Sequence, residues 1–241
     1  MAFQGRSVLA IVPARGGSKG ILRKNLAVVG DRSLIAHAAA TAAALDWIDA
    51  RICSTDDDEM AKEAELYGLE APFRRPAELA SDTASAADAW RHAWLASEDH
   101  FGKTFDVALW LQPTTPLRDP ADVERTLQTM LDGGFESAAT ISEIPAHVRP
   151  ERAMTLGESG ELGFYVEAGR SHANRQTIPA TWFRNGICYA ASRRTVVDEG
   201  QTIAERAAGV PVEGTVVSID EEIELELANV IWKKQQASGS N

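Results

Sequence analysis

The sequence has little cysteine and no long apolar run, and these two features exclude several classes of protein. Cys53 and Cys188 are the two cysteines among 241 residues, which is too few for the disulfide framework of a small secreted domain. No window approaches the roughly 18 consecutive apolar residues of a membrane-spanning helix. We therefore expect a cytoplasmic protein that does not bind a membrane.

Positive charge is also scarce. The chain has 24 Lys and Arg residues against 35 Asp and Glu residues, so its formal net charge is −11. Nucleic acids are polyanions, and this balance argues against binding them. Residues 1–30 are the local exception, because they hold Arg6, Arg15, Lys19, Arg23 and Lys24 and no acidic residue. A basic, glycine-rich segment in an acidic chain predicts a site for a small anionic ligand.

The first half of the chain alternates short apolar runs with helical patterns, which predicts an α/β fold with a largely parallel sheet covered on both faces. The expected strands are 7–12, 51–54, 70–73 and 107–111. The expected helices are 33–45, 57–67, 120–131 and one that begins at Thr83 or Ser85, on which Trp90, Trp94 and Leu95 form an apolar face.

The rhythm changes after Gly133-Gly134. Residues 137–185 hold short strand-like pieces and no long helical pattern, so we expect a small β-rich insertion within one core domain made of residues 1–136 and 186–241. Thr215–Ile219 is expected to be the last strand and Glu221–Lys233 the last helix.

The strongest local motif runs from Ile11 to Asn25 and reads IVPARGGSKGILRKN. A strand that ends in a loop with Gly16, Gly17 and Gly20 lets backbone amides approach a polyphosphate, and the nearby cations can hold its oxygens. The motif lacks the glycine spacing of a dinucleotide fold and the G-K-[ST] of a Walker loop. It therefore predicts a phosphate loop of another kind.

This loop resembles the signature of the acylneuraminate cytidylyltransferases. Further blocks resemble the family in the same order along nearly the whole chain. They are Ser54-Thr-Asp56, Arg75–Thr83, Leu111–Arg118, Asn174–Gln176, Asn185-Gly186 and, more weakly, Ser218-Ile-Asp220. The resemblance implies a Rossmann-like nucleotidyltransferase core, a homodimer formed through the β-rich insertion, and a sugar site near that insertion.

The resemblance also implies a reaction, in which CTP and a 2-keto-3-deoxy sugar acid give a CMP-sugar and pyrophosphate. Arg15 and Lys24 are then the catalytic cations on the triphosphate. The implied nucleotide-binding residues are Ala14, Arg15, Gly16, Ser18, Lys19, Lys24, Asn25, Arg75 and Ala84. The implied sugar-binding residues are Gln112, Arg175, Gln176 and Tyr189, where the planar guanidinium of arginine suits a carboxylate.

The metal site departs from the family pattern. Transfer from a nucleoside triphosphate usually recruits Mg²⁺, or Mn²⁺ in its place, on carboxylates and phosphate oxygens. The family carries an Asp-x-Asp pair, but this chain has Ser218 in the first position, so Asp220 is the expected metal ligand. Asp220 could instead cap the last helix, and Asp56–Glu59 is expected to serve the N-terminus of its own helix.

Residues 183 and 184 are a second departure from the family pattern. Phe183 stands where the family often has an arginine, and Arg184 is displaced from that position by one residue. This puts the identity of the sugar acid in question.

Three other functions stay open on the sequence. Ser18-Lys-Gly20 favours the acylneuraminate enzymes over a Kdo cytidylyltransferase. A sugar-1-phosphate nucleotidyltransferase would share the core, and a non-catalytic CTP-binding module would fit the loss of a carboxylate at Ser218.

Overall fold

The computed structural model describes residues 3–18, 20–171 and 179–238. The chain forms two compact units, one of Met1–Thr140 with Asn185–Asn241 and the other of Ile141–Arg184. The expected boundary at residue 136 differs from this division because strand β6 (Ser137–Glu143) starts inside the sheet of the first unit.

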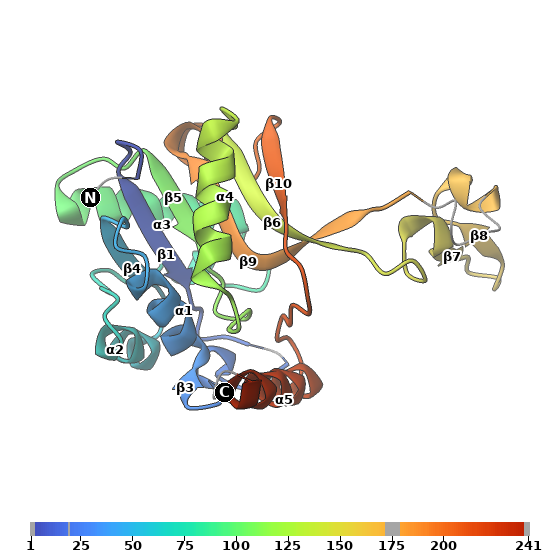
Figure 1. The fold of residues 1–241 in the computed structure, drawn as a ribbon, viewed down its shortest axis with the longest axis horizontal. Coiled ribbons are helices and arrows are strands. Elements are labelled where there is room, and N and C mark those ends of the chain that lie inside the picture. The colour runs from blue at the N-terminus through green and yellow to red at the C-terminus, as the bar shows by residue number, and fades with distance from the viewer. Residues whose placement is uncertain (1–2, 19, 172–178, 239–241) are drawn as a thin grey trace. The chain divides into compact units, whose positions relative to one another are not determined.

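A six-stranded sheet forms the centre of the first unit, in the order β10-β6-β9-β5-β1-β4 (Figure 1). β1 pairs in parallel with β4 and with β5, and β9 pairs antiparallel to β5. The expected α/β class is therefore confirmed. The sheet is mixed, and it is parallel where β4, β1 and β5 pair. The bounds of these strands are Val8–Pro13 for β1, Ala50–Ser54 for β4, Val107–Trp110 for β5, Trp182–Ser192 for β9 and Ala207–Pro211 for β10.

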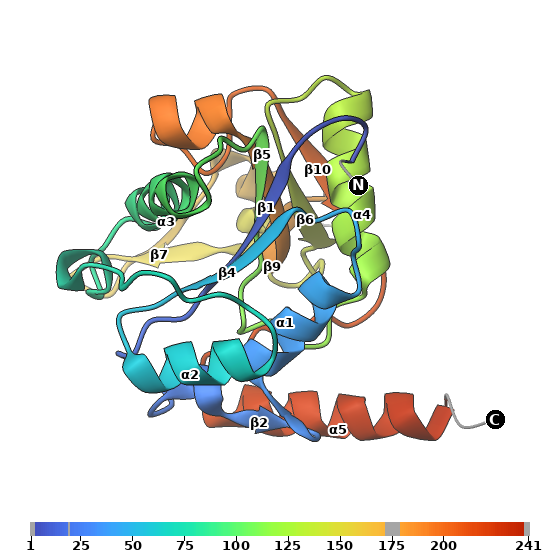
Figure 2. The same cartoon turned by 90° about the vertical axis from the view of Figure 1, so that its left-hand side faces the viewer.

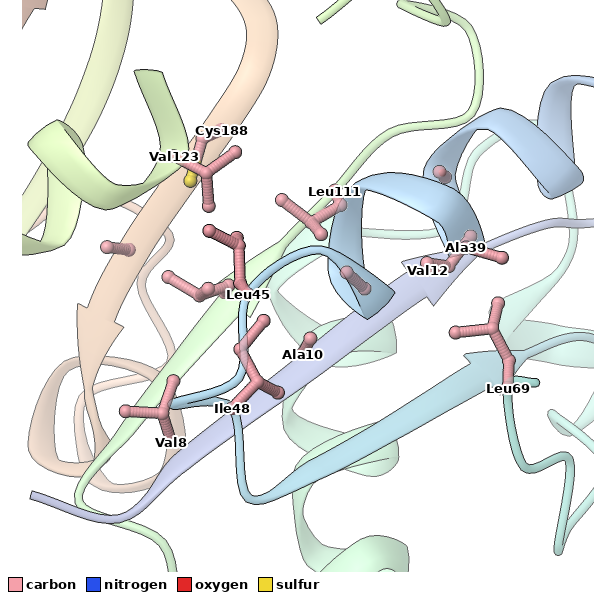
Figure 3. Packing of buried hydrophobic residues seen from close by; sticks show 14 of the residues in the cluster. Val8, Ala10, Val12, Ala39, Leu45, Ile48, Leu69, Leu111, Val123 and Cys188 are labelled. Carbon is pink, nitrogen blue, oxygen red and sulfur yellow. The ribbon is translucent and has the colours of Figure 1, made fainter. Parts of the chain in front are cut away.

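Helices cover both faces of this sheet, as Figure 2 shows for α3 on one side and α1 and α4 on the other. The side chains of β1 alternate between the two cores. Val8, Ala10 and Val12 pack with α1, α2 and α4 (Figure 3), whereas Leu9 and Ile11 pack with Trp90 and Trp94 of α3. The helices are α1 (Leu34–Ala43), α2 (Asp58–Leu66), α3 (Ala86–Phe101) and α4 (Pro120–Asp132).

Side-chain caps set the starts of these helices. Ser33 accepts a hydrogen bond from the N–H of Ala36, Asp57 from those of Glu59 and Met60, and Ser85 from that of Asp88. The expected role of Asp57 at a helix N-terminus is confirmed, and Ser85 rather than Thr83 begins α3. Cys53 behaves as a small buried hydrophobic residue, since burial raises the pKa of its thiol to about 12.

Three sequence-based predictions of local structure are wrong. Glu70–Phe73 is no strand, because only Glu70 makes an isolated bridge, to Ile52. Thr215–Ile219 is extended but unpaired, and the last strand is β10, earlier in the chain. Leu95 is 38% exposed and lies off the apolar face that buries Trp90 and Trp94.

The second unit is a small element with a two-stranded sheet of β7 (Met154–Leu156) and β8 (Leu162–Phe164). Arg149 is its buried centre, where the guanidinium donates to the carbonyl oxygens of Ile144 and Pro179 and pairs with Glu143. Several large apolar side chains of this unit are exposed, namely Leu156, Leu162, Tyr165, Trp182 and Phe183.

Within the described ranges, no helix combines the length and the apolar character needed to cross a membrane.

Glu98 joins three segments of the first unit. Its carboxylate accepts from the indole N–H of Trp94 at 3.1 Å, from the backbone N–H of Phe105 at 3.2 Å and from Nε of Arg193 at 2.9 Å. Burial opposes its charge, but the bonds from Arg193, Phe105 and Trp94 outweigh burial and hold the pKa of Glu98 below its ordinary value. The carboxylate thus ties the end of α3 to β5 and to the end of β9.

We expect Glu98→Gln to lower the free energy of unfolding by about 1–3 kcal/mol, because the amide keeps an acceptor but loses the charge that pairs with Arg193. A depressed carboxyl pKa stabilises the fold above the unfolded value of 4.5, and this contribution disappears as the pH falls through the folded pKa. Urea unfolding at pH 7 and pH 3 measures both effects. Asp99→Asn, on the exposed next position of α3, is the control, and an equal loss in both variants would contradict the role of Glu98.

Candidate active site

A cleft of about 340 Å³ opens at the ends of β1 and β5, where the chain leaves Pro13 and Trp110. The carboxyl ends of parallel strands meet at one edge of a sheet, and ligands of α/β proteins bind at that edge. The volume falls in the range of sites for small molecules, roughly 300–1,000 Å³. Seven of the residues named from the sequence line it together: Arg15, Ser18, Lys24, Asn25, Arg75, Ala84 and Gln112.

Arg15 crosses the mouth of this cleft to the loop that precedes α3. Its guanidinium forms an ion pair with Asp82 at 3.0 Å and donates to the carbonyl oxygen of Ser81 at 3.0 Å. Ser81 and Asp82 line the cleft beside Ala84. Ser81 and Asp82 were not predicted as site residues, although both fall in the Arg75–Thr83 block.

Lys24 forms an ion pair with Asp220, with 2.6 Å between Nζ and Oδ1. The lysine side chain is only 14% exposed, whereas that of Asp220 is 73% exposed. Asp220 does not line the cleft directly but is joined to it through Lys24. The N-terminus of α5 (Glu222–Ser238) is satisfied by Glu224, whose carboxylate accepts the N–H groups of Asp220 and Glu221.

The three glycines of the phosphate loop have different surroundings. A Cβ on Gly20 would lie 2.2 Å from the carbonyl oxygen of Asp220, so glycine is needed there for the approach of a distant segment. The N–H of Gly16 donates to Asp56 at 2.8 Å and Gly16 lies against Asp57. Gly17 lines the cleft and has open space at its Cβ position. Of the three glycines, it is therefore the one whose backbone a ligand in the cleft could approach.

Two buried side chains, those of Asn25 and Arg75, line the cleft together with Ala84. Asn25 donates through Nδ2 to the carbonyl oxygen of Arg15 at 3.0 Å. Arg75 donates to Oγ and to the carbonyl oxygen of Ser54, at 3.1 and 2.6 Å. Burial lowers the pKa of the Arg75 guanidinium, but an arginine stays charged at neutral pH. Both residues are thus held rigidly at the wall that they share with Ala84.

Gln112 lies on the opposite wall, against the start of the core portion of β9. A Cβ on Gly186 would lie 2.7 Å from Oε1 of Gln112, and the φ of Gly186 is +81°. The Asn185-Gly186 pair therefore makes room for Gln112. Buried Arg118 donates to the carbonyl oxygens of Gln112 and Thr115 and fixes the turn between them.

The remaining predicted site residues either do not line the cleft or lie outside the described residues. Ala14 is buried behind the loop and Tyr189 pairs with Trp110 across β9 and β5, so neither lines the cleft in the described part of the chain. Lys19, Arg175 and Gln176 lie outside the described residues.

The segment that carries Asp220 runs along the edge of the cleft. Ile219 donates its N–H to the carbonyl oxygen of Thr114, a lining residue, at 2.8 Å. Val217 and Ile219 are buried, so Ser218 and Asp220 share the exposed face. Among the residues that the structure describes, no group of three or more His, Cys, Asp or Glu side chains could hold a metal ion.

Comparisons with known proteins agree with this arrangement. The chain is 28% identical over 233 residues to the N-acylneuraminate cytidylyltransferase of Escherichia coli, covering 95% of this chain and 52% of that protein. It is also 28% identical over 233 residues to a pseudaminic acid cytidylyltransferase of Campylobacter jejuni, covering 95% and 98% of the two chains.

A solved structure of CMP:2-keto-3-deoxy-manno-octonic acid synthetase, complexed with CTP, has the same fold. The TM-score is 0.70 at 19% identity, and the match covers 95% of this chain and 99% of that chain. The cytidylyltransferase family profile matches residues 9–156, which include the phosphate loop and every described lining residue of the cleft. The chain therefore belongs to the cytidylyltransferase family and is a nucleotidyltransferase.

Proposed function

We propose that the chain transfers the CMP group of CTP to a nonulosonic 2-keto-3-deoxy sugar acid and releases pyrophosphate. The observation that carries this proposal is the meeting of Arg15, Lys24, Arg75 and Gln112, from three distant segments, around one cleft. The relatives that act on N-acylneuraminate and pseudaminic acid support this class of sugar.

The chemistry requires cations that are already in place. The anomeric hydroxyl of the sugar acid forms a bond to the α-phosphorus, the bond to the pyrophosphate oxygen breaks, and the hydroxyl proton leaves. CTP brings about four negative charges and the sugar acid brings one more, so positioned cations must stabilise the charge on the leaving group. We assign Arg15, Lys24 and Ser18 to the triphosphate, and Asn25, Arg75 and Ala84 to the nucleoside.

Both proposed catalytic cations form ion pairs with carboxylates. Arg15 contacts Asp82 and Lys24 contacts Asp220. Phosphate oxygens would replace these carboxylates, because charge-assisted bonds to several phosphate oxygens exceed the weak net contribution of an exposed ion pair. Binding of CTP would thus free two carboxylates at the cleft.

Asp220 fits the role of a Mg²⁺ ligand once Lys24 has turned to the phosphates. Mg²⁺ is often held by one or two carboxylates together with substrate phosphates. Ser218 and Asp220 are both exposed and lie two residues apart, so we assign the carboxylate of Asp220 and the hydroxyl of Ser218 to the ion, or to Mn²⁺ in its place. The bound metal would neutralise phosphate charge during transfer.

The sugar side of the cleft begins at Gln112, which Gly186 and Arg118 hold in place. We assign Arg175, Gln176 and Tyr189 to the sugar acid from the family resemblance, with the guanidinium of Arg175 on its carboxylate.

We also propose that the chain is a cytoplasmic homodimer. The second unit spans Ile141–Arg184 and leaves Leu156, Leu162, Tyr165, Trp182 and Phe183 exposed. A small two-stranded element gains little stability from its own core, and a second copy of the chain would cover this apolar surface. The buried, unpaired thiols of Cys53 and Cys188 suit a reducing compartment.

We expect Lys24→Ala to lower kcat by about 10²–10³, because the variant loses a cation that stabilises charge developing in the transition state. Pyrophosphate release in saturating CTP and Mg²⁺ measures the change. Lys62→Ala removes an exposed lysine of α2 and is expected to keep full turnover. A Lys24→Ala enzyme within about threefold of the parent would remove Lys24 from the catalytic cations.

We expect Asp220→Asn to raise the Mg²⁺ concentration for half-maximal turnover by about tenfold or more, since an amide is a weaker ligand than a carboxylate. Titration of Mn²⁺ in the presence of CTP, followed by electron spin resonance, gives the same comparison without turnover. Glu226→Gln, an equal charge change on the exposed face of α5, is the control. A change of less than about twofold would show that Asp220 is not a metal ligand.

A substrate panel tests the reaction itself. We expect pyrophosphate release from CTP with N-acetylneuraminic or pseudaminic acid, and slower release with the eight-carbon acid Kdo. Preference for Kdo would make the chain a Kdo cytidylyltransferase, and activity with a hexose 1-phosphate alone would make it a sugar-1-phosphate nucleotidyltransferase. Tight CTP binding with no turnover on any acceptor would leave a non-catalytic CTP-binding module.

A further inference from the structure

Arg23, directly before Lys24, has an unusual backbone conformation. Its φ and ψ are 55° and 38°, in the left-handed region, and among the described residues Gln4 is the one other non-glycine residue with positive φ. This region is disfavoured for residues with a Cβ. The turn at Arg23 begins the short 3₁₀ helix Lys24–Leu26, so it sets the direction in which the next side chain, that of Lys24, leaves the backbone.

The side chain of Arg23 is anchored at the start of α2. Nη2 lies 3.1 and 3.2 Å from the two carboxylate oxygens of Asp57, and Nη1 lies 2.6 Å from Glu59. Asp57 is itself fixed, because it caps α2 through the N–H groups of Glu59 and Met60. The anchor is therefore a rigid point at the end of β4, and the Arg23 side chain is fixed to it by three short polar contacts.

The two neighbouring cations are thus held by different parts of the fold. Arg23 is tied to α2, and Lys24 is tied to Asp220, just before α5. Lys24 lines the cleft, whereas Arg23 is not among the described lining residues. A disfavoured backbone conformation beside a functional side chain persists only where surrounding contacts impose it. The contacts that the structure shows at this turn are two backbone bonds, from Lys24 N–H to Ile21 and from Leu26 N–H to Arg23, and the ion pairs of the Arg23 side chain with Asp57 and Glu59.

We propose that Arg23 is a positioning residue for the transfer reaction, whose ion pairs with Asp57 and Glu59 hold the left-handed turn that presents Nζ of Lys24 to the triphosphate. This inference rests on the proposed role of Lys24. It differs from two simpler roles for the same arginine, which are direct binding of phosphate and general stabilisation of the fold.

We expect Arg23→Ala to lower kcat by about tenfold to a hundredfold, since a displacement of about 1 Å can cost that much, with the KM for CTP within about threefold. Asp57→Asn keeps a capping side chain and Glu59→Gln keeps the length of the side chain, and each should lower kcat by about threefold to tenfold. Arg23→Gly relaxes φ but removes the ion pairs, so it should be as impaired as Arg23→Ala. Glu65→Gln, an exposed carboxylate of α2, is the charge-matched control.

Two double variants separate the roles. In Lys24→Ala, the further change Arg23→Ala should cost little, because Arg23 acts through Lys24. In Arg23→Ala, the further change Glu59→Gln should likewise cost little. Direct phosphate binding by Arg23 would instead raise the KM for CTP, leave Asp57→Asn and Glu59→Gln active, and make the double variants additive, and that result would overturn the proposal.

A readout without turnover completes the test. Acetic anhydride labelling of the nucleotide-free protein, read by peptide mass spectrometry, should modify Lys24 about threefold faster or more in Arg23→Ala, because the anchored side chain is only 14% exposed. Lys62 serves as the internal reference, and thermal unfolding checks the fold. Unchanged labelling, or losses of kcat that follow only a lower Tm, would overturn the proposal. Full turnover of Lys24→Ala would instead refute the role of Lys24, whatever the labelling shows.

Discussion

The crowding of like charge around one loop is the constraint on which the rest of the site depends. Arg15, Arg23, Lys24 and Arg75 lie around the same cleft or beside it, and they would repel one another if unmatched. Their partners come from distant segments: Asp82 before α3, Asp57 and Glu59 at α2, Asp220 before α5, and the carbonyl oxygen of Ser54. Acidic side chains, which are in excess in this chain of net charge −11, therefore pair with the cations and hold the basic site together. Because these pairs are partly exposed, each contributes at most about 1 kcal/mol to stability, and their main effect is on geometry.

Close backbone approaches complete what the ion pairs begin. Gly20 brings the phosphate loop against the carbonyl oxygen of Asp220, and Gly186 brings the start of the core part of β9 against Gln112. Ile219 adds a backbone bond to Thr114. Three segments that are far apart in the sequence are thereby held at one edge of the sheet, where β1 and β5 end. A side chain at either glycine would separate them, which explains why the site needs glycine at positions other than the phosphate-facing Gly17.

Only some of the interactions that build this fold leave a local pattern in the amino-acid sequence. Buried strands and capped helices do, so β1, β4, β5 and the start of α1 at Ser33 were predictable. Glu70–Phe73 and Thr215–Ile219 have strand-like composition, but the first makes only the isolated bridge at Glu70 and the second joins no strand. Strand pairing is a property of the tertiary fold. The motif residues of the cleft were predictable because the family resemblance covers them. The pairs Arg15–Asp82 and Lys24–Asp220 were not, because nothing in the spacing of residues 24 and 220 indicates contact. The left-handed turn at Arg23 was equally hidden, since arginine is a poor signal for positive φ.

The ion pairs Arg15–Asp82 and Lys24–Asp220 bear on how the proposed reaction would bind and release its phosphates. Cations without carboxylate partners would attract any anion, so both CTP and pyrophosphate would bind with high affinity. When Asp82 and Asp220 occupy Arg15 and Lys24, phosphate must replace them, so part of the binding energy of the triphosphate is offset. This offset applies equally to bound CTP and to the transition state, so it weakens nucleotide affinity and leaves kcat unchanged. The same carboxylates can recapture the two cations as pyrophosphate leaves, which favours release of a product that carries much of the charge of CTP. On the proposed roles of Arg15 and Lys24, these ion pairs therefore hold the site together and would favour the release of pyrophosphate.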